Sequence, residues 1–501
     1  MQADAKRKIQ RILLIQPPWY RLFGSGVTVK IPLGLCYMSA VLNKNGLDAS
    51  VYDAEFASGE STNLSIFGMT KNIDSYLDKN KDLNMPVWKN VEKKIREYNP
   101  DAVGISVKTP TLRSGLNIAK ICKKINPQMS VIMGGVHASC LPKQTVSFSE
   151  VDFVVIGEGE YTLVDLIKRL NSGADINDCP GIAYKNKNGE VVINSPRKLI
   201  ANLDELPVPD RDNLLDKNEY PKDSYGEIFT GRGCPYSCIF CASKSIWGQK
   251  TRHRTSEKVV EEIELVHRKY GTGYFCIEDD TFMMDKKKMN EFCDLLIKKK
   301  LPIKWDCETR VNLVTEEALK KIKDAGCVLL NVGVESGSDE TLKKIKKGIT
   351  VNQIEKAFKL IRRAKIPVSA FIMIGFPWEK KEDMIRTVDF AQSLSPQRLV
   401  LSVVTPYPGI ELFDICNAQY NMQLDENCKW EEFFHQSNKV VLPDMDKKEF
   451  HDLVEVLEKR VMNYTTQMRF KSAEFWKARF SMYLKRPKKI IDDITSLVKQ
   501  I

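Results

Sequence analysis

The chain has 501 residues, of which 43% are hydrophobic, so it is long enough to form more than one buried core. Its 76 basic and 65 acidic residues give a net charge of +11, which favours anionic ligands such as phosphates or carboxylates. This charge is not concentrated in the first 400 residues, so nucleic-acid binding is not predicted. No run of about 18 uninterrupted apolar residues is present, so we expect no transmembrane span.

The first residues lack the apolar core of a signal peptide and lead directly into an expected strand. The 13 cysteines are scattered through the chain rather than arranged as a disulfide framework. The sequence therefore predicts a cytoplasmic protein with reduced thiols.

Apolar runs and helix-periodic segments alternate over the first 170 residues, with an irregular insertion expected up to about residue 86. This alternation is typical of an α/β fold with a doubly wound, Rossmann-like parallel sheet. We expect strands at 11–16, 49–52, 102–107, 130–133 and 153–156, and helices at 34–45, 90–98, 112–125 and 161–170. The segment 181–194 has the pattern of a hairpin, and L-D-E-L-P-V-P-D after it marks a linker.

Ligands of doubly wound sheets bind at the carboxyl ends of the strands. In this chain those ends carry glycine, proline and hydroxyl residues, which let a large ligand approach the backbone closely. The candidate binding residues are Pro18, Ser106, Thr109, Gly134, Gly135, His137, Gly157, Glu158 and Gly159. His137 has two possible roles. We favour the role of a polar residue that closes a phosphate loop or starts a helix, and the alternative is a metal ligand.

The central motif of the chain is G-R-G-C-P-Y-S-C-I-F-C, which occupies residues 231–241. Its cysteines, Cys234, Cys238 and Cys241, share one loop, and Phe240 gives that loop an apolar wall. An iron-sulfur cube usually takes four thiolates, so three would leave one iron open for chemistry. A zinc site is the alternative, but it normally pairs two short Cys-x-x-Cys hairpins, and the sequence has no second one.

Strands and helices alternate six times from residue 227, with strands expected at 227–230, 274–277, 303–307, 328–334, 368–374 and 398–404. Six such units predict a partial (β/α)6 barrel of the TIM type with its chemistry at the C-terminal rim. Helices at about 447–460 and 473–484 form a small α-helical C-terminal region. The dispersed Cys276, Cys293, Cys307 and Cys327 are interpreted as core residues.

The cysteine loop resembles that of the radical SAM superfamily. The runs I-E-D-D-T-F, C-E-T-R-V-N, V-G-V-E-S-G-S-D-E-T-L and F-I-M-I-G-F-P-W-E resemble the cobalamin-dependent branch of that superfamily. The earlier runs P-L-G-L-C-Y-M-S-A-V-L, V-G-I-S-V-K-T, G-G-V-H-A-S and V-D-F-V-V-I-G-E-G-E resemble its cobalamin-binding domain. The resemblance spans about residues 8–415, with one departure at Ile410, where the family usually has Thr.

This resemblance implies a cobalamin-binding domain at 8–172, a hairpin and linker at 173–224, a radical SAM barrel at 225–415 and a helical region at 416–501. The implied cofactors are a [4Fe-4S] cluster on the three cysteines, S-adenosylmethionine, and cobalamin on the strand-end residues named above. The Asp-x-His-x-x-Gly motif of many cobalamin proteins is absent, so we expect no histidine on cobalt. A flavodoxin-like or nucleotide-binding domain is the alternative for the N-terminal half.

S-adenosylmethionine presents an ammonium and a carboxylate, which need counter-charges inside a dry barrel. Asp279 or Asp280 and Arg310 are the candidates for these charges, and Glu335 is the candidate for the ribose hydroxyls. Ser336 and Gly375, at the ends of the fourth and fifth strands, complete the candidate set. A surface salt bridge is the alternative for any one acidic residue, but polar residues follow four strand ends in succession.

The resemblance implies a C-methyltransferase that acts on an unactivated carbon. A radical oxidative cyclase or ring-rearranging enzyme, of the anaerobic porphyrin-ring cyclase type, has the same domain order, and a cobalamin- or redox-sensing protein is the non-enzymatic alternative. The implied partners are a small-molecule or peptide substrate and a reductant such as flavodoxin or ferredoxin. The basic and aromatic segment 468–489 is expected to pack on the barrel, with peripheral membrane contact as the alternative.

Overall fold

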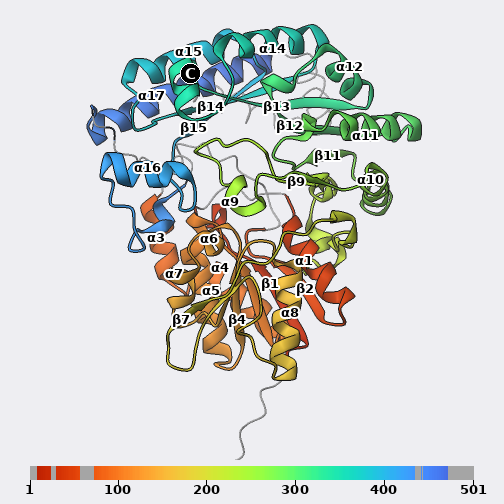
Figure 1. The fold of residues 1–501 in the computed structure, drawn as a ribbon, viewed down its shortest axis with the longest axis vertical. Coiled ribbons are helices and arrows are strands. Elements are labelled where there is room, and N and C mark those ends of the chain that lie inside the picture. The colour runs from red at the N-terminus through yellow and green to blue at the C-terminus, as the bar shows by residue number, and fades with distance from the viewer. Residues whose placement is uncertain (1–7, 24–29, 57–72, 435–441, 443, 472–501) are drawn as a thin grey trace, which may run out of the picture.

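The computed structural model describes residues 8–23, 30–56, 73–434, 442 and 444–471. Figure 1 shows two sheet-containing halves, with strands β1, β4 and β7 in the lower half and β11 to β15 in the upper half. Helix α9 (Ser243–Trp247), which follows the cysteine loop, lies between them. The site is therefore built where the two halves meet.

The N-terminal sheet has seven strands and confirms the predicted Rossmann-like topology. Its strands, in spatial order, are β2 (Asp48–Asp53), β1 (Arg11–Gln16), β3 (Ala102–Ser106), β4 (Ser130–Gly134), β5 (Phe153–Val155), β6 (Ile182–Lys185) and β7 (Val191–Ile193). The first five strands are parallel, in the 2-1-3-4-5 order of flavodoxin-like sheets. The predicted hairpin, β6 and β7, adds to β5 in antiparallel fashion, so the sheet continues past residue 172.

Helices cover both faces of this sheet. Helices α1 (Leu33–Lys44) and α8 (Gly159–Ser172) pack together, as do α4 (Pro86–Tyr98) and α5 (Leu112–Ile125). Three further helices, α3 (Ile73–Lys81), α6 (Val136–Cys140) and α7 (Pro142–Ser147), have no counterpart in the sequence prediction. Each has only two buried residues, so its apolar pattern is too short to show a helical period.

The second sheet confirms the predicted partial barrel. Its six parallel strands, in spatial order, are β15 (Arg398–Val403), β14 (Val368–Ile374), β13 (Cys327–Glu335), β12 (Lys304–Arg310), β11 (Tyr274–Ile277) and β8 (Glu227–Ile228). The chief helices of the outer layer are α10 (Ser256–Tyr270), α11 (Lys286–Lys299), α12 (Glu316–Asp324), α14 (Val351–Ala364) and α15 (Lys381–Ser393). Cys293, Cys307 and Cys327 are buried in this half, as predicted, whereas Cys276 is only half-buried and its thiol donates to Asp306.

The C-terminal region begins with α16 (Glu411–Tyr420) and includes α17 (Lys447–Phe470). Helix α17 packs on β15 and α15, and it is longer than the helix predicted at 447–460. The helix predicted at 473–484 lies outside the described residues. Short helix α13 (Asp339–Lys344) follows β13.

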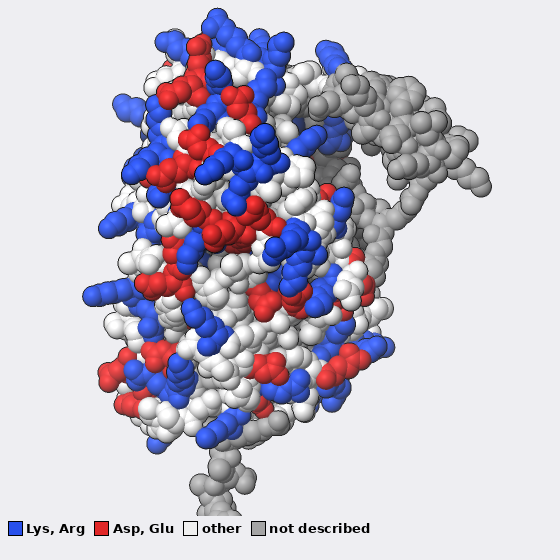
Figure 2. Space-filling model, turned by 90° about the vertical axis from the view of Figure 1, so that its right-hand side faces the viewer, with Lys and Arg blue, Asp and Glu red and all other residues white. Residues whose placement is uncertain are grey.

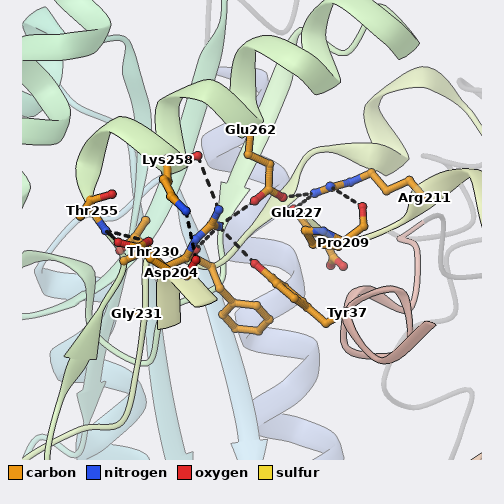
Figure 3. Close-up of polar contacts among 12 residues, drawn as sticks. Tyr37, Asp204, Pro209, Arg211, Glu227, Thr230, Gly231, Thr255, Lys258 and Glu262 are labelled. Carbon is orange, nitrogen blue, oxygen red and sulfur yellow. Dashed lines mark hydrogen bonds and ion pairs between the residues drawn. The ribbon is translucent and has the colours of Figure 1, made fainter. Parts of the chain in front are cut away.

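A buried ionic cluster joins the linker to the barrel (Figure 3). Glu262 of α10 accepts hydrogen bonds from Arg211 of the linker at 2.8 Å and from Arg254 at 2.7 Å. Arg254 also donates to the hydroxyl of Tyr37, which belongs to α1 of the N-terminal half. Buried charges are tolerated only when they are paired, so this cluster specifies how the linker and the two halves pack.

Figure 2 shows basic and acidic side chains interspersed over the visible face rather than gathered into single-sign areas. No helix among the described residues is long and apolar enough to span a bilayer.

Candidate active site

A cavity of about 390 Å³ lies between the two halves. One wall comes from the carboxyl ends of β1 and β3 and from α6, and the other comes from the barrel half. The lining residues are Gln16, Pro17, Trp19, Tyr20, Glu55, Ser106, Lys108, Thr109, Pro110, Thr111, Val136, Ala242, Tyr407 and Pro408. The predicted binding residues Ser106 and Thr109 thus line the cavity, and Pro18 lies between two lining residues. Ala242 directly follows Cys241, so the cysteine loop forms part of the opposite wall.

Gly134 and Gly135 directly precede the cavity-lining residue Val136, and we call this glycine pair the platform. Gly135 has φ +92° and ψ −177°, a region open essentially to glycine. A Cβ atom there would lie 2.7 Å from the carbonyl oxygen of Val107. The loop after β3 can therefore pack directly on the start of α6, which places its backbone close to a ligand. This cradle fits the corrin of cobalamin.

His137 follows the platform glycines and is fully buried. Its ring atom Nδ1 lies 3.3 Å from the hydroxyl of Thr109, and its backbone N–H donates to the carbonyl of Val107. Burial lowers the pKa of His137 to about 4, so the imidazole is neutral at physiological pH. These contacts fit a residue that closes the loop, whereas the buried Nε2 has no hydrogen-bond partner among the described residues, so the role of His137 stays a prediction.

The motif Gly157-Glu158-Gly159 takes a different position from the one predicted. Gly157 donates its N–H to the hydroxyl of Ser139, but the Glu158 side chain points away from the cavity. The Glu158 carboxylate instead accepts hydrogen bonds from Arg232 and Arg252. A Cβ on Gly159 would lie 2.7 Å from the methyl carbon of Met38, so Gly159 serves helix packing. These contacts leave only the backbone of this motif near the strand ends.

The cysteine loop receives hydrogen bonds at its sulfur atoms. Arg310 donates to Sγ of Cys238 at 3.4 Å, and the N–H of Ser243 points at Sγ of Cys241 at 3.5 Å. Cys234 and Cys238 are half-buried and Cys241 is exposed, so the three thiols are accessible to a cluster. Donors aimed at sulfur and the triad on one loop fit a [4Fe-4S] cluster. In the part of the chain that the structure describes, no three potential ligands converge on a position for one metal ion.

Asp279 and Asp280 have separate roles. Asp279 is buried and accepts the N–H groups of Thr230 at 2.7 Å and Gly231 at 3.1 Å, which holds the entry to the cysteine loop. Burial raises the pKa of Asp279 to about 6. Asp280 accepts from the hydroxyl of Ser243 at 2.6 Å, directly beside the loop. Of the two carboxylates, Asp280 has the capacity left for an ammonium group.

Arg310 is the last residue of β12, and its guanidinium stacks on the ring of Tyr236 at 3.6 Å. One N–H group also reaches the carbonyl of Lys347. These contacts hold the guanidinium beside Cys238, and the pairing of Arg310 with a carboxylate stays a prediction.

Glu335 is also the final residue of its strand, and it has a left-handed backbone with φ +66°. Its buried carboxylate pairs with Lys347 at 2.5 Å, so it is committed to an ion pair in this structure. Ser336 contacts the hydroxyl of Thr387 rather than the cavity. Gly375, with φ +86°, donates its N–H to Glu379, which holds the turn after β14.

The structure also shows a charged group in which Lys30 and Glu227, two residues that the sequence prediction did not single out, join the strand-end residue Glu278. Lys30 pairs with Glu278 at 2.6 Å and Glu227 at 3.3 Å. Burial and the neighbouring Glu278 carboxylate raise the pKa of Glu227 to about 7. A glutamate within a short parallel strand is unusual, and this is the signal that could have identified Glu227.

The fold and the site together define a radical enzyme whose cluster-binding barrel is preceded by a cobalamin-binding domain. The B12 binding domain family matches residues 27–167, and the radical SAM superfamily matches residues 228–391. The chain therefore belongs to the radical SAM superfamily, in its branch with an N-terminal B12 binding domain. Membership implies a [4Fe-4S] cluster, S-adenosylmethionine and cobalamin as cofactors.

Individual relatives agree with this assignment. An uncharacterized methyltransferase of Pyrococcus horikoshii is 32% identical over 424 residues, which cover 84% of this chain and 86% of the relative. An anaerobic magnesium-protoporphyrin IX monomethyl ester cyclase of Rubrivivax gelatinosus is 30% identical over 384 residues, which cover 75% and 67%. The solved structure of the cobalamin-dependent S-adenosylmethionine radical enzyme OxsB superposes with a TM-score of 0.68 at 19% identity, over 96% of this chain and 71% of OxsB.

Proposed function

We propose that this enzyme transfers a methyl group to an unactivated carbon atom of its substrate. The observation that carries the proposal is the cavity between the halves, which is lined by Ser106 and Thr109 on one side and by Ala242, the residue after Cys241, on the other. A substrate in that cavity would face both cofactors at once. The name of the Pyrococcus horikoshii relative, a methyltransferase, supports the same reaction class.

When bound, the cluster with S-adenosylmethionine supplies a carbon radical on the substrate, and cobalamin supplies the methyl group. The chain's own residues bind, orient and exclude water. Cys234, Cys238 and Cys241 would hold the cluster, while Arg310 and Asp280 would pair the charges of S-adenosylmethionine. Ser106, Thr109 and Gly135 would hold the corrin.

Apolar side chains close the cavity between the two cofactors. Trp19, Tyr407 and Pro408 line it together with Ala242, so a reactive intermediate there would meet few water molecules. The carboxylates of Glu227 in β8 and of Glu278, directly after β11, pair with Lys30. We propose that they contact the polar part of the substrate.

An oxidative cyclase is the second candidate, and the 30% identity to the Rubrivivax gelatinosus cyclase supports it. The two reactions differ in their by-products, because only methyl transfer must remethylate the corrin. A methyltransferase should release S-adenosylhomocysteine and 5'-deoxyadenosine in parallel as product forms. A cyclase should release only 5'-deoxyadenosine.

The test is anaerobic turnover with labelled S-adenosylmethionine and extract, followed by mass spectrometry of products. A chain with Ala at Cys234, Cys238 and Cys241 is the control, since it should lose the cluster absorbance and the formation of 5'-deoxyadenosine. Product without added methyl, formed with no S-adenosylhomocysteine, would replace the methyltransferase proposal by the cyclase. Cluster retention in the triple variant would contradict the assigned ligands.

We further propose that the chain works in the cytoplasm with a reductant such as flavodoxin or ferredoxin. The scattered cysteines and the electron requirement of a radical SAM cluster support this. The proposed functional division remains 8–172 for cobalamin, 225–415 for the radical chemistry and 416–501 for the helical region. Limited proteolysis with mass spectrometry would test these boundaries.

A further inference from the structure

The two strands that bracket the cysteine loop carry buried arginines. Strand β9 (Gly231–Arg232) pairs antiparallel with β10 (Arg252–His253), so Arg232 lies opposite Arg252 in register. The three cysteines all lie between these strands. The loop that would hold the cluster is therefore closed at its base by a ribbon with one arginine on each strand.

Both arginines bind the same carboxylate of the other half. Arg232 donates to Oε1 of Glu158 at 2.8 Å, and Arg252 donates to Oε2 of Glu158 at 2.8 Å. The N–H of Ile200 also donates to Glu158 at 2.7 Å, and Arg232 donates to Glu160 at 2.6 Å. The four charged side chains are only 4–7% exposed.

The charges in this group are balanced, with two guanidinium and two carboxylate groups. Glu158 and Glu160 stand at the N-terminus of α8, where the helix dipole favours negative charge. The Arg232 guanidinium also lies between the rings of Trp247 at 4.9 Å and Tyr37 at 5.7 Å. Desolvated, charge-assisted hydrogen bonds from both arginines to one carboxylate have narrow geometry, so they hold the ribbon in one orientation.

The residues before Arg232 are held by the barrel. Asp279 accepts the N–H groups of Thr230 and Gly231, whereas the next residue is held by Glu158 of the N-terminal half. The start of the cysteine loop thus takes its position from both halves within three residues. A change at Glu158 would move the loop relative to the platform without touching a cysteine.

We propose that Glu158, supported by Glu160, is a positioning residue that sets the distance between the cluster and the corrin. This inference rests on the proposed function in one respect, namely that both cofactors bind where the site places them. It goes beyond that function because it gives the Gly-Glu-Gly-Glu motif a role in coupling the cofactors rather than in binding cobalamin.

The test uses the full chain reconstituted with cluster and cobalamin, and it compares Glu158→Gln with the wild type. Asp165→Asn is the matched control, because Asp165 lies on the same helix and its ion pair with Arg197 is partly exposed. The readout is the relaxation enhancement of the cobalt(II) electron paramagnetic resonance signal by the reduced cluster, which depends steeply on distance. Iron and corrin content are measured on the same samples.

We expect Glu158→Gln to keep its iron and corrin but to lose the single enhanced relaxation rate of the wild type. Turnover should fall by about 10²-fold for a displacement near 1 Å, while Asp165→Asn behaves as wild type. Unchanged relaxation in Glu158→Gln would overturn the inference, even if the variant is less stable. A wild type that binds no corrin would overturn the proposed function and this inference with it.

If Glu158→Gln does not fold, the double variant Glu158→Gln with Arg252→Gln replaces it, because it leaves no unpaired charge at that position. The double variant should fold and still lose the single relaxation rate. Wild-type relaxation in the double variant would overturn the inference.

Discussion

Replacing Gly135 by Ala tests whether the platform loop is held by direct backbone packing. The observed φ and ψ of Gly135 cost a residue with a side chain about 1–3 kcal/mol. The new Cβ would also meet the backbone oxygen and nitrogen of Val107 at 2.7 and 2.9 Å, and neither atom can turn aside as a flexible side chain would. Overpacking adds about 1–3 kcal/mol, so the total cost is roughly 2–6 kcal/mol.

Gly157→Ala is the matched control, because Gly157 also has positive φ, +74°, but a Cβ there would meet nothing within 4 Å. It should cost only about 1–2 kcal/mol. Urea unfolding measures both costs. A cobalamin titration followed by absorbance measures corrin affinity. This affinity should fall about tenfold in Gly135→Ala for each 1.4 kcal/mol of binding free energy lost at the platform. Equal effects of the two substitutions would refute the packing argument.

Three further predictions concern single side chains. Arg310→Lys removes the stack on Tyr236 and weakens the hydrogen bond to the thiolate, so the cluster potential should fall by on the order of tens of millivolts, given that 59 mV corresponds to about 1.4 kcal/mol; an unchanged potentiometric titration would contradict this. Burial raises the pKa of Glu379 to about 8, so its protonated form stabilises the fold at low pH and this contribution is lost as the pH rises through that value. In the wild type, the free energy of unfolding measured with urea should therefore fall between about pH 5 and 8. This fall should be absent in Glu379→Gln and present in the variant of an exposed residue, Glu382→Gln. Cobalt(II) electron paramagnetic resonance should show no nitrogen superhyperfine splitting in either the wild type or His137→Ala, and a splitting lost in the variant would show that His137 binds cobalt.

Both sheets were predictable because their parallel strands are buried on both faces and read as apolar runs. The cysteine triad was predictable because its spacing is local. We expected Arg310 and Glu335 after the ends of their strands, but each is the final residue of its strand. Polar residues at the rim of the barrel give no local signal of where a strand stops. Strand β12 thus ends three residues beyond the predicted position 307, and β13 ends one residue beyond 334; shifts of one or two residues are usual at element ends.

The role of Glu158 could not be predicted in the same way. Its partner Arg232 lies 74 residues away in another half of the molecule, and neither local periodicity nor spacing reports on such a contact. The buried pair of Glu335 with Lys347 escaped for a related reason, since a lysine in a basic run reads as an exposed surface residue.

The partial barrel ends at β8 on one edge and at β15 on the other, and α17 covers β15, with Thr465 accepting the N–H of Leu399. A closed barrel would have further strands between β8 and β15. Here the N-terminal half takes their place as one wall of the cavity. The width of the cavity, which we call the reaction chamber, therefore depends on how the two sheet-containing halves pack against each other. Substitutions of lining residues such as Tyr407 and Pro408, apart from the Glu158 contacts that hold the cysteine loop, can widen the chamber for bulkier substrates while the loop and its chemistry stay as they are.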